Sequence, residues 1–69
     1  MTMATYEVMI ETRDFRMSRI LATTTKAEAI KTARERARTS GGKVAWVHVF
    51  NIPTALSVVS FQALNKSLA

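Results

Sequence analysis

The 69-residue chain contains no cysteine, one proline, two glycines and one histidine. The absence of cysteine excludes disulfides, thiolate zinc sites and a cysteine nucleophile together. A chain of this length buries only about 60% of the surface that its unfolded state exposes, so its margin of stability is small. Small domains without disulfides or metals often gain stability by self-association. We therefore expect a single small domain, residues 1–69, that forms a homodimer.

Long apolar runs are also missing. No run approaches the roughly 18 residues that are needed to span a bilayer. The first seven residues lack the basic segment and following apolar segment of a signal peptide. Hydrophobic residues nevertheless make up 48% of the chain, which is too many for a disordered protein. These observations predict a folded cytoplasmic protein that makes no contact with a membrane.

Groups that support catalysis are scarce. Glu7 and Glu11 would share a strand face about 13 Å apart, beyond the carboxylate spacing of glycosidases. His48 is the only histidine, so no histidine pair can bind a metal, and no carboxylate near it in the sequence would orient it. We expect His48 to be satisfied on a sheet face or to lie in a contact surface beside Trp46. The chain is predicted not to be an enzyme and to need no cofactor or metal.

The clearest element is a helix predicted over residues 26–39. Thr25 is its expected N-cap, and Glu28 three residues later completes a capping box. Gly41 and Gly42 are expected to end the helix, because glycine readily takes the left-handed conformation that closes one. The small side chains on one face would let the helix approach a sheet closely. That face is predicted to consist of Ala27, Ile30, Ala33 and Ala37.

A hairpin of two strands is predicted before the helix. Residues 4–11 alternate with a period of two, which places Tyr6, Val8 and Ile10 on one face. Residues 17–24 form the second strand, in which neither face is clearly apolar.

The part of the chain after the helix is predicted to return to the sheet. Residues 43–50 are rich in β-branched and aromatic side chains, which are typical of a strand. Residues 55–64 allow either a fourth strand or a second helix capped by Thr54, and the adjacent Val58 and Val59 favour the strand. The pattern predicts an α+β fold of order β-β-α-β-β, an antiparallel sheet with one helix packed on one face, in which the last element is undecided.

Both faces of the strand at 43–50 are apolar, whereas one helix covers only one side of a sheet. We expect Trp46 and Phe50 to fill the space beneath the alanine face of the helix. The alternative is that these rings stack on the bases of a single-stranded nucleic acid. If the rings are core, the other face is an uncovered apolar strip that suits a dimer or a protein partner. That predicted interface consists of Ala45, Val47 and Val49.

Lysine and arginine outnumber aspartate and glutamate by ten to five, for a net charge of +5. Such a density suits nucleic acid or an acidic protein surface, although charge that only keeps a small protein soluble would give the same count. The cations form two clusters, one on the solvent face of the helix and one around the first hairpin. The predicted binding residues are Lys31, Arg34, Arg36 and Arg38 on the helix and Arg13, Arg16 and Arg19 on the hairpin.

The segment from Leu21 to Phe50 resembles some small phage-encoded anti-CRISPR proteins. The shared pattern is a short strand, a helix that opens at threonine and carries lysines and arginines, and a strand after glycine. The resemblance implies a compact β-β-α-β-β inhibitor that docks onto an RNA-guided surveillance complex and blocks target DNA. It is a likeness of pattern and size, and it assigns a role to no individual residue.

Together, these features predict a non-catalytic basic binding module that contacts nucleic acid or a nucleoprotein complex electrostatically. Its affinity should fall steeply with salt, because neutralised phosphates release counterions. The alternative is a protein–protein interaction module or small subunit, homodimeric through an apolar sheet face.

Overall fold

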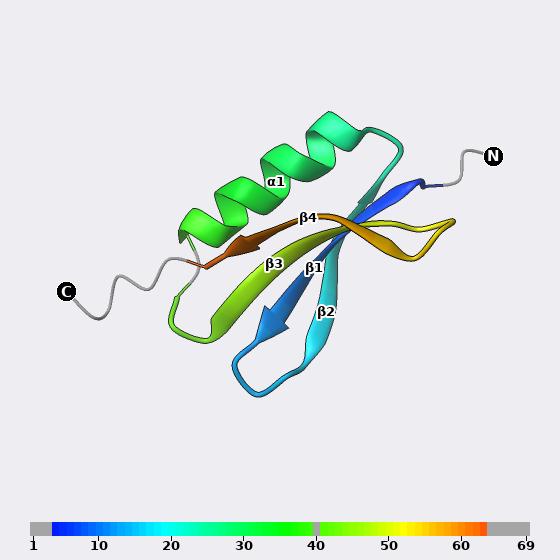
Figure 1. Cartoon of the computed structure of the whole chain (residues 1–69). Coiled ribbons are helices and arrows are strands. Elements are labelled where there is room, and N and C mark those ends of the chain that lie inside the picture. The colour runs from blue at the N-terminus through cyan, green and yellow to red at the C-terminus, as the bar shows by residue number, and fades with distance from the viewer. Residues whose placement is uncertain (1–3, 40, 64–69) are drawn as a thin grey trace.

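The computed structural model describes residues 4–39 and 41–63 as a four-stranded antiparallel sheet with one helix across it (Figure 1). The elements are β1 (Tyr6–Thr12), β2 (Met17–Thr23), α1 (Lys26–Thr39), β3 (Val44–Asn51) and β4 (Leu56–Gln62). The predicted α+β class and the β-β-α-β-β order are confirmed. The undecided last element is a strand, and the end of its predicted range, residue 64, lies outside the described residues.

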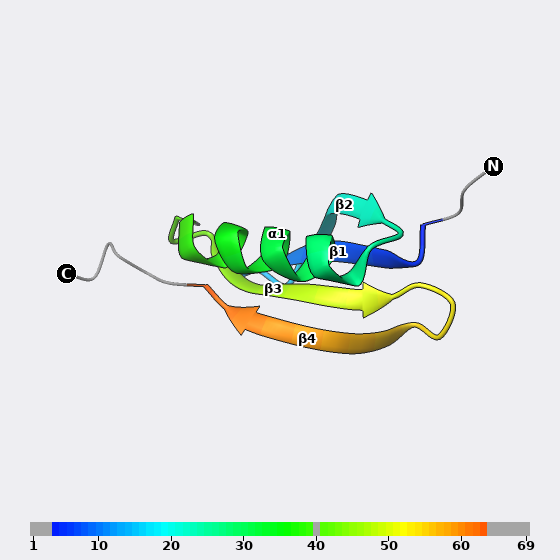
Figure 2. The ribbon, with the colours of Figure 1, turned by 90° about the horizontal axis from the view of Figure 1, so that it is seen from above.

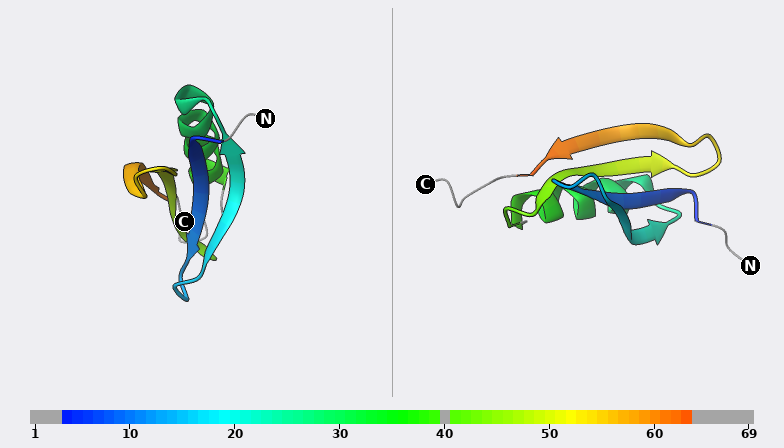
Figure 3. Two further views of the ribbon diagram at one scale, coloured as in Figure 1. Left: turned by 90° about the vertical axis from the view of Figure 1, so that its right-hand side faces the viewer. Right: turned by 90° about the horizontal axis from the view of Figure 1, so that it is seen from below.

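The sheet has the strand order β2-β1-β3-β4. The two central strands, β1 and β3, are antiparallel neighbours although the hairpin partner β2 and the helix separate them in the chain. Seen from above, α1 lies over the sheet (Figure 2). Seen from below, the strands lie in front of the helix and no described helix covers them (Figure 3). The core that the described residues form therefore sits on the helix side of the sheet.

Helix α1 has the predicted bounds, but its buried stripe differs from the predicted one. Ala29, Ala33 and Ala37 are buried, Ile30 is half-buried, and Ala27 is exposed. The prediction for Ala27 was wrong because this residue precedes Ala29 by two positions, about 200° around the helix axis. The buried stripe follows four-residue steps, and it places three small side chains against the sheet.

The start of the helix is held by Thr23 as well as Thr25. The N–H of Thr25 donates to Oγ1 of Thr23 at 3.2 Å, and the Thr23 hydroxyl donates to the carboxylate of Glu28. Glu28 therefore bonds the side chain of Thr23 instead of the N–H of Thr25 that a capping box requires. The helix ends at Thr39, just before the two glycines, but no described glycine has a positive φ, so the predicted left-handed closure by Gly41 and Gly42 was wrong.

The described strands carry β-bulges that decide which side chains share a face. In β2, Ile20 is the extra residue between the pairs Val8–Leu21 and Met9–Arg19. An extra residue reverses the alternation of a strand from that point on. Leu21 therefore joins Val8 on the helix side, whereas Arg19 joins Met9 on the other. This register explains why neither face of this strand is apolar throughout.

The two faces of β3 are assigned opposite to the prediction. Val47 and Val49 have no exposed surface and form one core cluster with Val8 and the buried alanines of α1. Trp46, which alternates with them, lies on the side of the sheet away from the helix and is 38% exposed. The prediction was wrong because a helix with alanine on its buried side lies so close to the sheet that valine is large enough to fill the space.

The predicted interface of Ala45, Val47 and Val49 is therefore not an uncovered strip. Val47 and Val49 are core residues, and Ala45 is half-buried at a bulge between the pairs Glu11–Trp46 and Thr12–Val44. The alternation of apolar residues in β3 indicated two apolar faces correctly, but it contained no information on which of them α1 covers.

Candidate functional site

The molecule presents two surfaces of different chemistry on opposite sides of the sheet. One is the helix side, formed by the solvent face of α1. The other is here named the open sheet face and consists of the strand side chains that point away from α1. Its members are Glu7, Met9 and Glu11 of β1, Met17, Arg19 and Ala22 of β2, Trp46, His48 and Phe50 of β3, and Ser57, Ser60 and Gln62 of β4.

The helix side carries the predicted helical cations. Lys31, Arg34 and Arg38 are exposed, as the three- and four-residue spacing predicted, and Arg36 is half-buried. The guanidinium of Arg34 lies 5.8 Å from the centroid of the Phe61 ring, within the range of a cation–π interaction. This contact ties the helix to the edge strand β4 and limits how freely Arg34 reaches a ligand.

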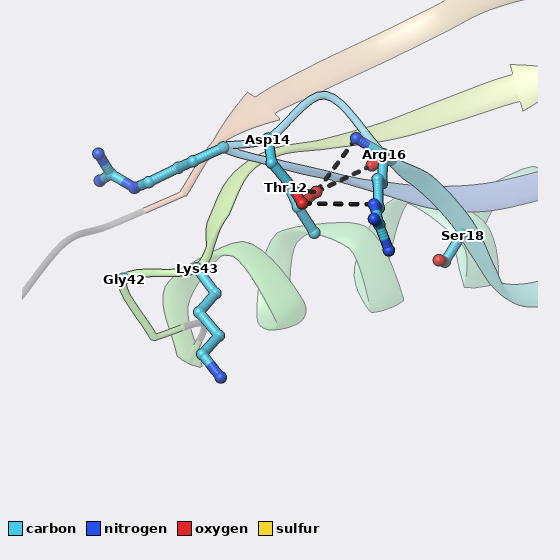
Figure 4. Close-up of a pocket in the computed structure, with 7 residues that line it drawn as sticks. Thr12, Asp14, Arg16, Ser18, Gly42 and Lys43 are labelled. Carbon is cyan, nitrogen blue, oxygen red and sulfur yellow. Dashed lines mark hydrogen bonds and ion pairs between the residues drawn. The ribbon is translucent and has the colours of Figure 1, made fainter.

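A second group of cations, here named the basic end, surrounds an open pocket of about 450 Å³ (Figure 4). It consists of Arg13 and Arg16 of the turn between β1 and β2 and Lys43 of the loop between α1 and β3. The N–H of Arg13 donates to the carbonyl oxygen of Lys43 at 3.0 Å, which joins the two segments. Lys43 was not predicted, because only the antiparallel pairing of β1 with β3 brings it to the hairpin.

The turn that carries the basic end is organised by Thr12. Its hydroxyl contacts Asp14 and accepts the N–H of Arg16 at 3.1 Å, and its own N–H donates to the carbonyl oxygen of Arg16 at 2.9 Å. Asp14 also pairs with the Arg16 guanidinium at 3.3 Å, and both side chains are more than 60% exposed. Figure 4 shows Arg16 and Lys43 on the two different segments that border the pocket. The pocket therefore has dispersed positive charge and one carboxylate.

Arg19 does not belong to either basic group. It lies on the open sheet face, where its Nη2 is 2.7 Å and its Nε 2.9 Å from Oε2 of Glu7. The seven cations predicted as one binding set are thus separated by the sheet. The structure places six of them on the helix side and the adjoining basic end, and the seventh on the opposite face.

His48 is held from both sides on the open sheet face. Its Nε2 lies 2.9 Å from Oε1 of Glu11, and its Nδ1 lies 2.6 Å from Oγ of Ser60. The expectation that no carboxylate orients His48 was wrong, because the pairing of β1 with β3 brings Glu11 to it from 37 positions away. The expectation that His48 is satisfied on a sheet face is confirmed.

A hydroxyl, an imidazole and a carboxylate in sequence are also the groups of a serine hydrolase. In this chain they stand on a strand face, and none of the three lines the pocket at the basic end. Among the residues that the structure describes, no group of three or more potential ligands is placed to hold a metal ion. We therefore treat Glu11, His48 and Ser60 as a hydrogen-bonded chain within a surface.

The rings of β3 form an aromatic row, defined as Trp46, His48 and Phe50. The Trp46 and His48 rings are nearly parallel, at 13°, with centroids 6.3 Å apart. The His48 and Phe50 centroids are 5.6 Å apart, at 41°. The sequence showed that these residues share a face. Because the prediction assigned that face to the core, it did not identify the aromatic row as part of the protein surface.

No protein-family model matches the chain, and no curated protein or solved structure was found to match it. The described helix, α1, is too short and too polar to cross a membrane. A fold of this kind does not by itself indicate a function, so function has to be argued from the two surfaces. The resemblance to anti-CRISPR proteins stays a prediction.

Proposed function

We propose that the chain is a non-catalytic module that binds nucleic acid, alone or within a nucleoprotein complex, along the helix side and the basic end. The supporting observation is the segregation of charge across the sheet. The exposed cations on this side outnumber the carboxylates Asp14, Glu28 and Glu35 by more than two to one. These exposed cations are Lys26, Lys31, Arg34 and Arg38 of α1 and Arg13, Arg16 and Lys43 of the basic end.

The length of α1 suits an extended polyanion. A helix of 14 residues is about 21 Å long. Over that distance a DNA duplex carries about 12 phosphate charges, so several cations can contact phosphates at once. These contacts would position the chain without reading a base sequence. Binding would thus be electrostatic and largely independent of sequence.

The salt dependence of binding tests the electrostatic mechanism. Five contacts with the phosphates of a DNA duplex would give a slope of about −4.5 in a plot of log K against log salt concentration. Fluorescence anisotropy with labelled duplex and single-stranded oligonucleotides, titrated at several salt concentrations, measures this slope. Affinity that does not change with salt, or no binding at the lowest salt concentration, would rule the mechanism out.

A matched pair of variants tests the surface. Arg38→Gln and Arg19→Gln remove the same charge from the same kind of side chain on opposite sides of the sheet. We expect Arg38→Gln to weaken binding several-fold and to reduce the salt slope by about 1, the value for one lost phosphate contact. Arg19→Gln should change neither the affinity nor the salt slope by a comparable amount. Equal losses in the two variants would mean that total charge, not the helix side, determines binding.

A nucleoprotein target is the form of this function that the anti-CRISPR resemblance favours. In that case bare oligonucleotides bind weakly and the partner complex binds tightly. A pull-down from the native host, with identification of both protein and nucleic acid, separates the two forms. Recovery of nucleic acid without protein would argue against the inhibitor form and leave the basic surface as proposed.

A further inference from the structure

We propose that the open sheet face is a self-association surface, on which a second copy of the chain packs face to face around Trp46 and Phe50. The sequence had placed an interface at Ala45, Val47 and Val49, but the structure buries Val47 and Val49 under the helix and leaves Ala45 half-buried. The proposal concerns the opposite face of the same strands. It does not depend on the binding of nucleic acid.

The charged side chains of the open sheet face and its histidine are already paired within one chain. Glu7 bonds Arg19, and Glu11 and Ser60 bond the two ring nitrogens of His48. Covering a polar group is costly mainly when it loses its hydrogen-bond partners. Here a second copy would cover pairs whose partners stay in place. The face is therefore suited to being covered by an apolar surface, and its cation Arg19 is already engaged.

The sheet edges are poor places for a second copy. Both edge strands carry a bulge, at Ile20 in β2 and at Val58 in β4. A bulge interrupts the regular row of N–H and C=O groups that another strand would need, and it is a common device against edge-to-edge pairing. Extension of the sheet by a neighbouring chain is thus disfavoured on both sides.

Charge disfavours a dimer that forms through the helix side. The helix side is strongly basic, so two helix sides repel each other, and a helix side offers Trp46 few apolar partners. In a face-to-face pair the two basic surfaces point outward in opposite directions. Such a pair is a two-fold, self-complementary arrangement, the commonest form of soluble oligomer.

The area of the open sheet face sets the expected affinity of the dimer. Four strands of about seven residues cover roughly 24 by 19 Å, which is on the order of 900 Å² for two faces together. This lies at or just below the small end of specific protein interfaces. We therefore expect a weak dimer, with a dissociation constant on the order of 10–100 μM.

The single tryptophan allows a direct test in the unmodified protein. Trp46 is the only tryptophan in the chain and lies in the proposed contact. As the concentration rises we expect the mass measured by sedimentation to double. Over the same range Trp46 emission should shift to shorter wavelength and its quenching by iodide should fall. A mass that stays monomeric up to about 1 mM, well above the expected dissociation constant, would overturn the proposal.

Three charge-introducing variants test the position of the contact. Trp46→Lys and Phe50→Lys place lysine in the open sheet face and should each raise the dissociation constant at least tenfold. Leu56→Lys is the matched control, because Leu56 is 67% exposed and does not belong to that face. Circular dichroism melts establish that each variant is folded. If Leu56→Lys prevents association while Trp46→Lys and Phe50→Lys do not, the open sheet face is not the contact.

Two further outcomes would also contradict the proposal. Growth beyond the dimer would mean that the open sheet face docks on a different surface of the next copy. Quenching of Trp46 by a single-stranded oligonucleotide in a chain that stays monomeric would mean that the aromatic row stacks on bases. In the second case the salt dependence and the Arg38→Gln result still report separately on the helix side.

Discussion

The two faces of the sheet are built from the same strands but differ in how their side chains are satisfied. The helix side is filled by small and medium apolar groups, with Val8, Val47 and Val49 wholly buried under alanines. The open sheet face holds the aromatic row together with the paired Glu7–Arg19 and Glu11–His48 groups. On β3, side-chain size separates the two faces. A helix lined with alanine lies too close for indole, so Trp46 stays at the surface, whereas Tyr6 and Phe61 are partly buried against the core.

The largest effect is expected where the helix meets the sheet. Ala33 has no exposed surface, whereas Ala27 on the same helix is exposed. Ala33→Leu should destabilise the fold by about 3 kcal/mol because a larger side chain forces α1 away from β1 and β3. Ala27→Leu should change stability by less than about 0.5 kcal/mol.

Urea unfolding followed by circular dichroism measures both variants. Similar losses for Ala33→Leu and Ala27→Leu would show that the helix does not pack as closely as the buried stripe indicates. Close packing of the helix would then not explain why Trp46 lies on the open sheet face.

An intermediate effect is expected from the hydrogen-bonded chain on the open sheet face. His48→Ala removes both hydrogen bonds and leaves the part-buried carboxylate of Glu11 without its imidazole partner. We expect a loss of about 1–2 kcal/mol, close to the cost of leaving such a group unsatisfied. Ser60→Ala keeps the contact between His48 and Glu11 and should cost about half as much. If thermal or urea unfolding shows a larger loss of stability for Ser60→Ala than for His48→Ala, the assigned pairing is contradicted.

The smallest effect is expected from the ion pair between Glu7 and Arg19. Because the Arg19 side chain is 58% exposed, the coupling should be only about 0.5 kcal/mol and should shrink as salt is added. A double-mutant cycle with Glu7→Gln and Arg19→Gln isolates this coupling from the effects of the single changes. A salt-independent coupling above about 1.5 kcal/mol would mean that this pair is shielded from solvent, and the open sheet face would then be covered in solution.

Much of the secondary structure was predictable because its signals are local. The bounds of α1 follow from Thr25 and the run of strong helix formers after it, and the period of two in β1 identifies Tyr6, Val8 and Ile10 as the inward side. The last strand was harder, since Val58 and Val59 are adjacent and a β-bulge at Val58 breaks the alternation. No local pattern indicated this bulge, so the segment matched neither the period of two of a strand nor the period of 3.6 of a helix well.

The surfaces were less predictable because they combine distant segments. Lys43 joins Arg13, and Glu11 reaches His48, only through the pairing of β1 with β3. Arg19 is separated from Arg16 although they are three positions apart, because alternation along β2 directs Arg19 to the side where Glu7 lies.

By itself, the sequence determined the class of fold, the position of the helix, the basic character of its solvent side and the presence of two apolar faces on β3. These properties depend on residue type and on spacing within one element. Only the tertiary structure decided which face the helix covers, which cations lie together and what holds His48. The physical reason is that these depend on strand order, register and the distance between helix and sheet, which arise when elements far apart in the chain pack against one another.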